Sequence, residues 1–211
     1  MITAILLAAG ASRRFGDSNK LLAHVGDDVM VAKTARIVMR CRVQEIIVVT
    51  GPDADPIRAS IEHALNESPA NCTTKVRFVA NPNCAEGIGT SIATGITALD
   101  IATDGALVVL GDMPAVQPVL IDAVIARFEA MRSDRVTFPA TLDGRQMNPV
   151  LWPRRCFEPL RRLTGDRGGK AMITAEGERG EPVLWPNEAT FADIDTEPAL
   201  KIFKDHSSSK S

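Results

Sequence analysis

Four short apolar runs are spaced along the first half of the chain, and they govern the fold that the sequence predicts. They cover residues 2–8, 45–50, 75–80 and 105–111. Apolar residues follow one another in these runs instead of alternating with polar ones. This pattern is typical of strands that are buried on both faces of a parallel sheet.

Segments with a helical period separate these runs. In each segment, apolar residues recur three or four positions apart and therefore share one face of a helix. They are Ile57, Ile61, Ala64 and Leu65 after the second run, Ile88, Ile92, Ile96 and Leu99 after the third, and Leu120, Val124, Phe128 and Met131 after the fourth. Strands that alternate with helices in this way indicate a parallel sheet wrapped by helices.

The second half of the chain is less regular. Strands are expected at 135–142 and 146–152, joined by a tight turn at Asp143 and Gly144. We then expect a helix at 153–163, a loop at 164–170 and a short helix after residue 170. Two late strands are expected at 181–186 and 190–194, and a closing helix at 197–203. The fold class is therefore α/β: a doubly wound, Rossmann-like fold of three layers with a mostly parallel mixed sheet.

The chain contains neither an internal repeat nor a linker, which favours one domain. We expect that domain to cover residues 1–204. The remaining residues, 205–211, are polar and low in complexity. They are expected to form a disordered tail.

Composition excludes several classes of protein. The net charge is −2 with scattered basic residues, and aromatic residues are 4% of the chain, so a nucleic-acid surface is not expected. The four cysteines lack C-x-x-C spacing, which favours reduced thiols. The apolar N-terminal run has no basic region before it, and no apolar run reaches the roughly 20 residues that span a bilayer. We therefore expect a cytoplasmic protein without a membrane partner.

The first strand ends in a stretch that resembles a phosphate cradle. Ala8, Ala9 and Gly10 lie at the strand's carboxyl end, where parallel α/β sheets bind ligands and where small residues let a ligand approach the backbone. Arg14 and Lys20 follow and supply positive charge for phosphate. The spacing fits neither a P-loop nor the dinucleotide fingerprint. From composition alone, a solvated basic loop is about as good an interpretation.

The stretch LAAGASRRFGDSNKLL resembles the signature of the nucleotidyltransferases that activate molybdenum cofactor. The matching residues are Leu7, Ala8, Ala9, Gly10, Ser12, Arg14, Phe15, Gly16 and Lys20. Three further stretches, EGIGTSIATGI, VVLGDMPAV and DIDTEPAL, resemble the glycine-rich loop, the metal loop and the closing segment of that family. The resemblance implies a fold like that of nucleotide-diphospho-sugar transferases.

The form of these motifs resembles the cytidylyltransferase branch and its xanthine-dehydrogenase-associated relatives. The matching stretches are LAAG, GIGTS, NPVLW and LTGDRGG. Two residues depart from the family pattern. Gly169 stands where an alanine is usual, and Met147 stands where a glycine is usual.

The resemblance implies transfer of CMP from CTP, or from another nucleoside triphosphate, to the phosphate of molybdopterin, with release of pyrophosphate. Arg14 and Lys20 would be catalytic, and Asp112 with Asp195 would hold Mg²⁺. The nucleotide would contact Leu7, Ala8, Ala9, Gly10, Ser12, Gly16, Asn81, Gly87 and Ser91, and the acceptor would contact Asn148, Gly165 and Asp166. A molybdoenzyme is a possible protein partner.

Simpler interpretations stand beside these roles. Asp112 suits a turn, Asp195 suits a helix N-cap, and Asp193 could replace Asp195 as the metal ligand. Asn148, Gly165 and Asp166 also fit ordinary loops and caps. The alternative functions are a guanylyltransferase, a sugar- or polyol-phosphate nucleotidyltransferase, and a non-catalytic protein that delivers the cofactor to a xanthine-dehydrogenase-like enzyme.

Overall fold

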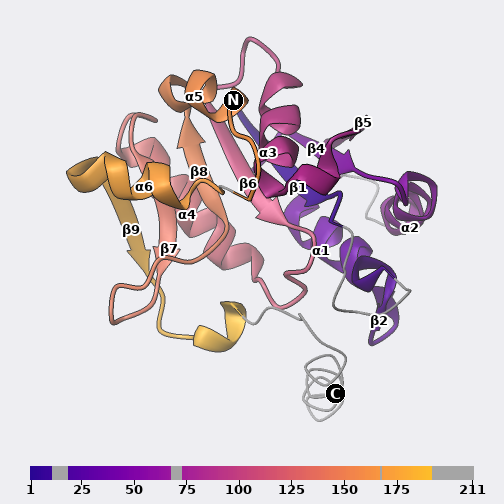
Figure 1. The fold of residues 1–211 in the computed structure, drawn as a ribbon. Helices are drawn as coiled ribbons and strands as arrows, with labels where there is room; N and C mark the ends of the chain where they lie inside the picture. Colours follow the sequence, from indigo (N-terminus) through magenta and orange to yellow (C-terminus); the bar gives the residue numbers. More distant parts are fainter. Residues whose placement is uncertain (11–18, 68–72, 167, 192–211) are drawn as a thin grey trace.

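A seven-stranded mixed sheet forms the centre of the protein in a computed structural model, which describes residues 1–10, 19–67, 73–166 and 168–191. Its strands are β1 (Ile2–Ala8), β4 (Glu45–Thr50), β5 (Lys75–Ala80), β6 (Gly105–Leu110), β7 (Val136–Ala140), β8 (Val150–Pro153) and β9 (Gly180–Leu184). The order is β5-β4-β1-β6-β8-β7-β9 (Figure 1). β1, β4, β5 and β6 are parallel, β8 is antiparallel to both its neighbours, and β9 is parallel to β7.

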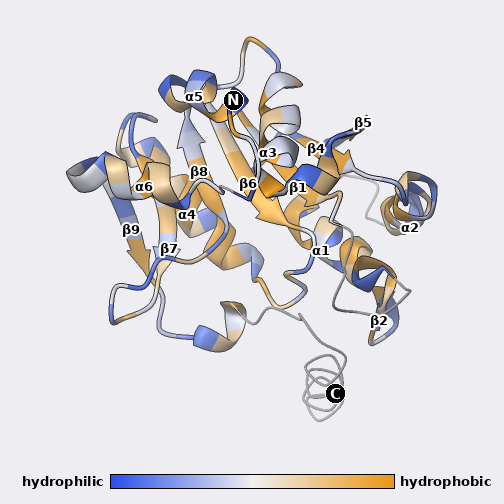
Figure 2. Cartoon of the chain, in the orientation of Figure 1, coloured by the Kyte–Doolittle hydropathy of each residue, from blue (hydrophilic) through white to orange (hydrophobic). Residues whose placement is uncertain are grey.

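Helices cover both faces of the sheet, because successive strand residues point to opposite sides. On β1, Leu6 and Ala8 pack with α1 (Met30–Met39), α2 (Ala54–Asn66) and α4 (Pro118–Ala130). Ile5 and Leu7 pack with α3 (Ile88–Thr97), α5 (Phe157–Arg161) and α6 (Lys170–Glu176). Figure 2 shows hydrophobic colours on β4 and β6 and a mixture of hydrophobic and hydrophilic colours on the helices. The predicted three-layer, doubly wound fold is confirmed.

Short elements complete the fold. They are η1 (Lys20–Leu22), β2 (His24–Val25), β3 (Asp28–Val29), η2 (Cys84–Glu86), η3 (Arg154–Cys156), η4 (Gly177–Arg179) and η5 (Glu188–Phe191). β2 and β3 form a separate two-stranded hairpin. Together with η1 they connect the loop after β1 to α1, a helix that the apolar pattern alone did not assign.

The first half matches the sequence closely, and the second half needs corrections. The turn at Asp143 and Gly144 is present, since the amide of Thr141 donates to the carbonyl of Arg145. The strand predicted at 146–152 begins only at Val150, because residues 147–149 leave the strand ladder. The strand predicted at 190–194 is wrong at its start, where Phe191 belongs to η5. The expected closing helix and tail lie outside the described residues.

The reversed strand β8 brings the segment before it to the edge of the sheet where the parallel strands end. β8 is antiparallel to β6, and Val150 at its start pairs with Val108 near the end of β6. The segment 146–149 therefore lies at the edge where the parallel strands end. Ligands of α/β proteins bind at this carboxyl edge.

Within the described part of the chain, every helix is too short or too polar to cross a membrane.

Burial makes a testable prediction about the thiols. Burial raises the pKa of Cys41 to about 12, with a smaller contribution from Asp122, and it raises the pKa of Cys156 to about 11. A raised thiol pKa lowers the thiolate fraction at pH 8, and the thiolate is the reactive form. Iodoacetamide at pH 8 should therefore label Cys84, which is partly exposed, much faster than Cys41 or Cys156. Peptide mass spectrometry measures this, and labelling in urea is the control. Equal labelling rates for the three cysteines in the folded protein would contradict the burial of Cys41 and Cys156.

Candidate active site

An ion pair between Lys20 and Asp112 lies at the carboxyl edge of the sheet. Lys20 begins η1, and Asp112 follows β6. The Lys20 Nζ donates to Asp112 Oδ2 at 2.5 Å. The two side chains are 17% and 16% exposed, so solvent screens the pair less than an open surface pair. The structure thus brings together two of the residues predicted for catalysis and metal binding.

Two anchors hold Lys20 in this position. The Asn19 Nδ2 donates to Asp53 Oδ2 at 2.8 Å, and Asn19 Oδ1 accepts from the Leu21 amide at 3.0 Å. Asp53 follows β4 and Asp112 follows β6, the two neighbours of β1. The segment 19–22 therefore spans the edge of the sheet from one neighbouring loop to the other, across the end of β1.

Most of the end of β1 is buried, whereas a phosphate cradle needs a backbone that a ligand can reach. Leu7, Ala8 and Ala9 are buried, and Ala9 is only 4% exposed. The Ala9 side chain packs in the apolar cluster beneath α3. Gly10 is exposed and is the part of this stretch open to a ligand. Arg14, with Ser12 and Gly16, lies outside the described residues.

Asn81 organises the loop between β5 and α3. It is 3% exposed, and its Nδ2 donates to the hydroxyls of Thr90 and Ser91, each at 2.9 Å. Its Oδ1 accepts from the Asn83 amide at 3.0 Å. Asn81 and Ser91, predicted as nucleotide contacts, thus bind each other and hold this loop on the helix. Ser91 lies inside α3, whose N-cap position is Gly87.

Gly87 joins this loop to the segment that precedes α6. Its φ of +118° is a conformation that residues with side chains rarely adopt, and a Cβ there would overlap Gly165 and the Asp166 carboxylate. The Gly89 amide donates to the Gly165 carbonyl at 2.9 Å. Gly165 and Asp166, predicted on the acceptor side, therefore lie against the start of α3.

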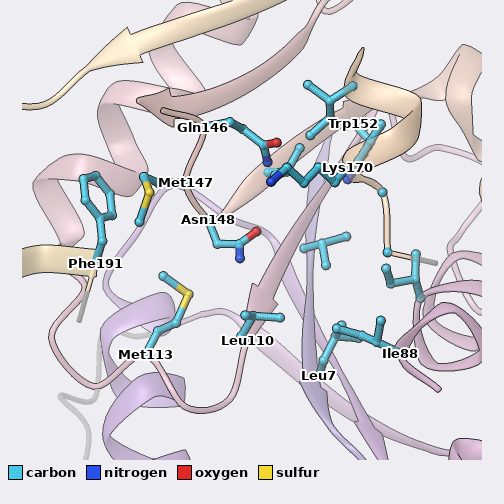
Figure 3. A pocket seen from close by; sticks show the side chains of 16 residues that line it. Leu7, Ile88, Leu110, Met113, Gln146, Met147, Asn148, Trp152, Lys170 and Phe191 are labelled. Carbon is cyan, nitrogen blue, oxygen red and sulfur yellow. The ribbon is translucent and has the colours of Figure 1, made fainter. Parts of the chain in front are cut away.

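A pocket of about 320 Å³ lies on the β6 and β8 side of β1 (Figure 3). Its walls are mostly apolar and include Leu7, Ile88, Leu110, Met113, Met147, Trp152, Ile173 and Phe191. Three polar side chains, Gln146, Asn148 and Lys170, also line it. Figure 3 shows Gln146 and Lys170 extending toward one another, with Asn148 pointing into the space beneath them. Asn148 is thus the predicted acceptor residue that the structure places in a cavity.

Both departures from the family pattern lie on the wall of this pocket. A Cβ on Gly169 would overlap the ring of Trp152, which is 2% exposed. The usual alanine at 169 is therefore incompatible with this tryptophan. Met147 occupies the wall where a glycine would leave space. These two residues therefore help to set the shape of the pocket.

Several pocket residues were missed from the sequence. Gln146 and Lys170 belong to two stretches, QMNPVLW and TGDRGGK, that the sequence singled out, so the signal was present. Met113 directly follows Asp112. For Phe191, the apolar pattern suggested only a strand. Among the described residues no cluster of three metal-binding side chains occurs, and Asp193 and Asp195 lie outside them.

Comparisons with known sequences identify the family of this chain. The profile of the family described as MobA-like NTP transferase domain matches residues 4–179. A Chloroflexus aggregans protein named "Probable molybdenum cofactor guanylyltransferase" is 27% identical, with 96% of this chain and 93% of that protein covered. A protein of Paenarthrobacter nicotinovorans named "Nicotine blue oxidoreductase" is 23% identical, with 92% of each chain covered.

Solved structures share the fold. A nucleotidyl transferase from Methanothermobacter thermautotroptrophicus superposes with a TM-score of 0.77 at 22% identity, covering 100% of this chain and 99% of that one. A Mycobacterium tuberculosis protein, Rv0371c, solved in complex with manganese, gives a TM-score of 0.72 at 20% identity, covering 97% and 98%. The predicted fold like that of nucleotide-diphospho-sugar transferases is confirmed.

The contact between Gly87 and Gly165 predicts a matched pair of substitutions. Gly87→Ala should lower the free energy of unfolding by about 3 kcal/mol or more, because backbone strain and steric overlap add. Gly144→Ala also has a positive φ, +87°, but a Cβ there meets open space. It should cost only about 1–2 kcal/mol. Urea unfolding measures both variants, and equal losses would show that the contact with Gly165 contributes nothing.

Proposed function

We propose a specific reaction for this chain, which belongs to the family of MobA-like NTP transferase domains and is a nucleotidyltransferase: it transfers CMP from CTP to the phosphate of molybdopterin and releases pyrophosphate. The observation that carries the proposal is the half-buried Lys20–Asp112 pair beside a mostly apolar pocket at one edge of the sheet. Both substrates are anionic, so cations and precise positioning supply most of the catalysis in such a transfer.

Lys20 and Asp112 have complementary roles in this proposal. Asp112 already holds a cation, the Lys20 ammonium, which supports a site suited to positive charge. Its carboxylate oxygens would hold Mg²⁺, which would neutralise the triphosphate when bound. The second ligand would be Asp195, or Asp193. Lys20, with Arg14, would stabilise the negative charge that develops during transfer, and Asn19 and Asp53 would keep Lys20 at the edge of the sheet.

The sheet order supports adjoining places for the two substrates. Gly10 with Leu7, Ala8 and Ala9, and the stretch containing Ser12 and Gly16, would form the nucleotide side. Asn81 follows β5, which lies beyond β4. Asn81, Gly87 and Ser91 would shape the nucleotide side through the loop between β5 and α3. The pocket lies toward β6 and β8, and its wall includes Leu7 of β1 and Ile88, the residue after Gly87. Asn148 would contact the acceptor there, and Gly165 and Asp166 would join the two sides.

The pocket favours a flat heterocyclic acceptor over a sugar or polyol. Its apolar walls suit the faces of a ring, and its few polar groups suit a ring edge. A polyol would bring several hydroxyls out of water against apolar side chains. Each hydroxyl without a partner would cost about 1–3 kcal/mol. Molybdopterin, whose ring system is a pterin, fits this chemistry, and a molybdoenzyme would then be the protein that receives the product.

Pyrophosphate release tests the reaction directly. CTP, GTP and ATP are each assayed with molybdopterin, with a sugar phosphate and with a polyol phosphate. We expect turnover with molybdopterin and a preference for CTP over GTP of at least about tenfold, since one misplaced group in a base site is worth that much. The motifs that resemble the cytidylyltransferase branch support this choice of base.

Each other result of this assay points to a different function. A preference for GTP would place the chain with the function named for its Chloroflexus relative. Tight binding of molybdopterin without turnover would favour a delivery protein. Turnover with the sugar phosphate or the polyol phosphate, but not with molybdopterin, would overturn the proposal that molybdopterin is the acceptor.

Asp112→Asn tests the metal role. The amide keeps the shape of the side chain and can still accept from Lys20, but it loses the charge that would hold Mg²⁺. Turnover should fall by on the order of 10²-fold or more and recover in part at high Mg²⁺. Asp27→Asn, in the exposed turn between β2 and β3, is the matched control and should keep full activity. An Asp112→Asn enzyme that is active but melts early would instead support a structural turn.

A further inference from the structure

Three polar side chains in the pocket lack partners within the described part of the protein. Gln146, Asn148 and Lys170 all line the pocket, and none makes a side-chain hydrogen bond or ion pair with a described residue. Gln146 and Asn148 are only partly exposed. Lys170 is exposed, and none of the three has a polar side-chain atom buried away from solvent, so their donors and acceptors stay available to a molecule that enters the pocket.

Polar groups with structural roles look different in this protein. The buried amide of Asn81 makes three hydrogen bonds, to Thr90, Ser91 and Asn83. Lys20 is paired with Asp112. The amides of Gln146 and Asn148 and the ammonium of Lys170 instead converge on a cavity (Figure 3). Their hydrogen-bonding groups are therefore open to a ligand in this cavity.

The position of Lys170 is fixed by contacts along the whole of α6. At the helix start, Gly169 packs against the ring of Trp152. In the middle, Ile173 is buried in the apolar cluster. At the end, Arg155 donates two hydrogen bonds to the Glu176 carboxylate, at 2.9 and 2.5 Å. The helix therefore holds Lys170 at the pocket.

We propose that Gln146, Asn148 and Lys170 determine acceptor specificity by reading the lactam edge of a flat ring, with Lys170 donating to the ring carbonyl oxygen. An ammonium only donates, so its partner must be an acceptor such as that oxygen. The amides both donate and accept, which matches the ring N–H and the neighbouring nitrogens. Trp152 and Met147 provide apolar walls for the ring faces. This inference rests on the proposed function and names the part of the acceptor that the site recognises.

Two pteridines that differ at one ring position test the proposed role of Lys170. Pterin carries a carbonyl oxygen at ring position 4, and 2,4-diaminopteridine carries an amino group there; both are fluorescent. At pH 8 the wild-type protein should bind pterin about tenfold to 100-fold more tightly, because the amino group cannot accept from Lys170. Lys170→Met should lose this preference, and Lys170→Glu should reverse it, since a carboxylate accepts from the amino group. Lys75→Met, on the edge strand β5 far from the pocket, is the matched control and should keep the wild-type preference for pterin.

Kinetics separate this inference from the proposed function. Lys170→Met should raise the KM for molybdopterin about tenfold or more while the KM for CTP and kcat stay near wild type. If Lys170→Met and Lys170→Glu keep the wild-type preference for pterin, the role of Lys170 is overturned, while turnover of CTP with molybdopterin by the wild type leaves the reaction intact. If the wild-type protein binds neither pteridine, the flat-ring acceptor is overturned together with this inference.

Discussion

The pairing of β1 with both β4 and β6 along its full length is the constraint on which the site depends. Six successive residue pairs join β1 to each neighbour, all in parallel. Parallel register makes the three strands end at one level, so Gly10, Asp53 and Asp112 arrive at the same edge although they are far apart in sequence. The segment 19–22 can then be bound by the loops of both neighbours at once. Without this register, Lys20 would have no fixed position.

The reversal of β8 adds the second half of the site. A parallel strand in its place would bring its end, not its beginning, to the carboxyl edge. Because β8 is antiparallel to β6, Gln146 and Asn148 reach that edge just before the strand starts. The apolar walls then come from both parts of the sheet and from α3 and α6. In the proposed reaction, the parallel half would supply charge for the phosphates, and both halves would enclose the acceptor.

Sequence alone predicted the parallel half well, because burial on both faces leaves continuous apolar runs that are hard to mistake. It also identified Lys20 and Asp112 through a specific motif, and the structure pairs them. The second half was harder. Val150 begins a strand that the apolar pattern placed four residues earlier, since periodicity does not reveal where a chain leaves the ladder. The pocket residues Lys170 and Phe191 come together only through tertiary packing, which a linear pattern does not encode. Asn81 and Ser91 are predicted nucleotide contacts, and the structure adds that the Asn81 amide donates to the Ser91 hydroxyl, a contact that a linear motif does not reveal.

The contact between Gly87 and Gly165 bears on how this scaffold could change its substrates. One loop belongs to the proposed nucleotide side and the other leads into the wall of the acceptor pocket, and they share a backbone hydrogen bond through Gly89. Remodelling either loop should therefore shift the other, and the two proposed substrate preferences should change together. Descendants of such an enzyme would acquire a new base and a new acceptor through linked substitutions on both loops. Libraries for laboratory evolution should therefore randomise residues 86–89 and 164–169 together.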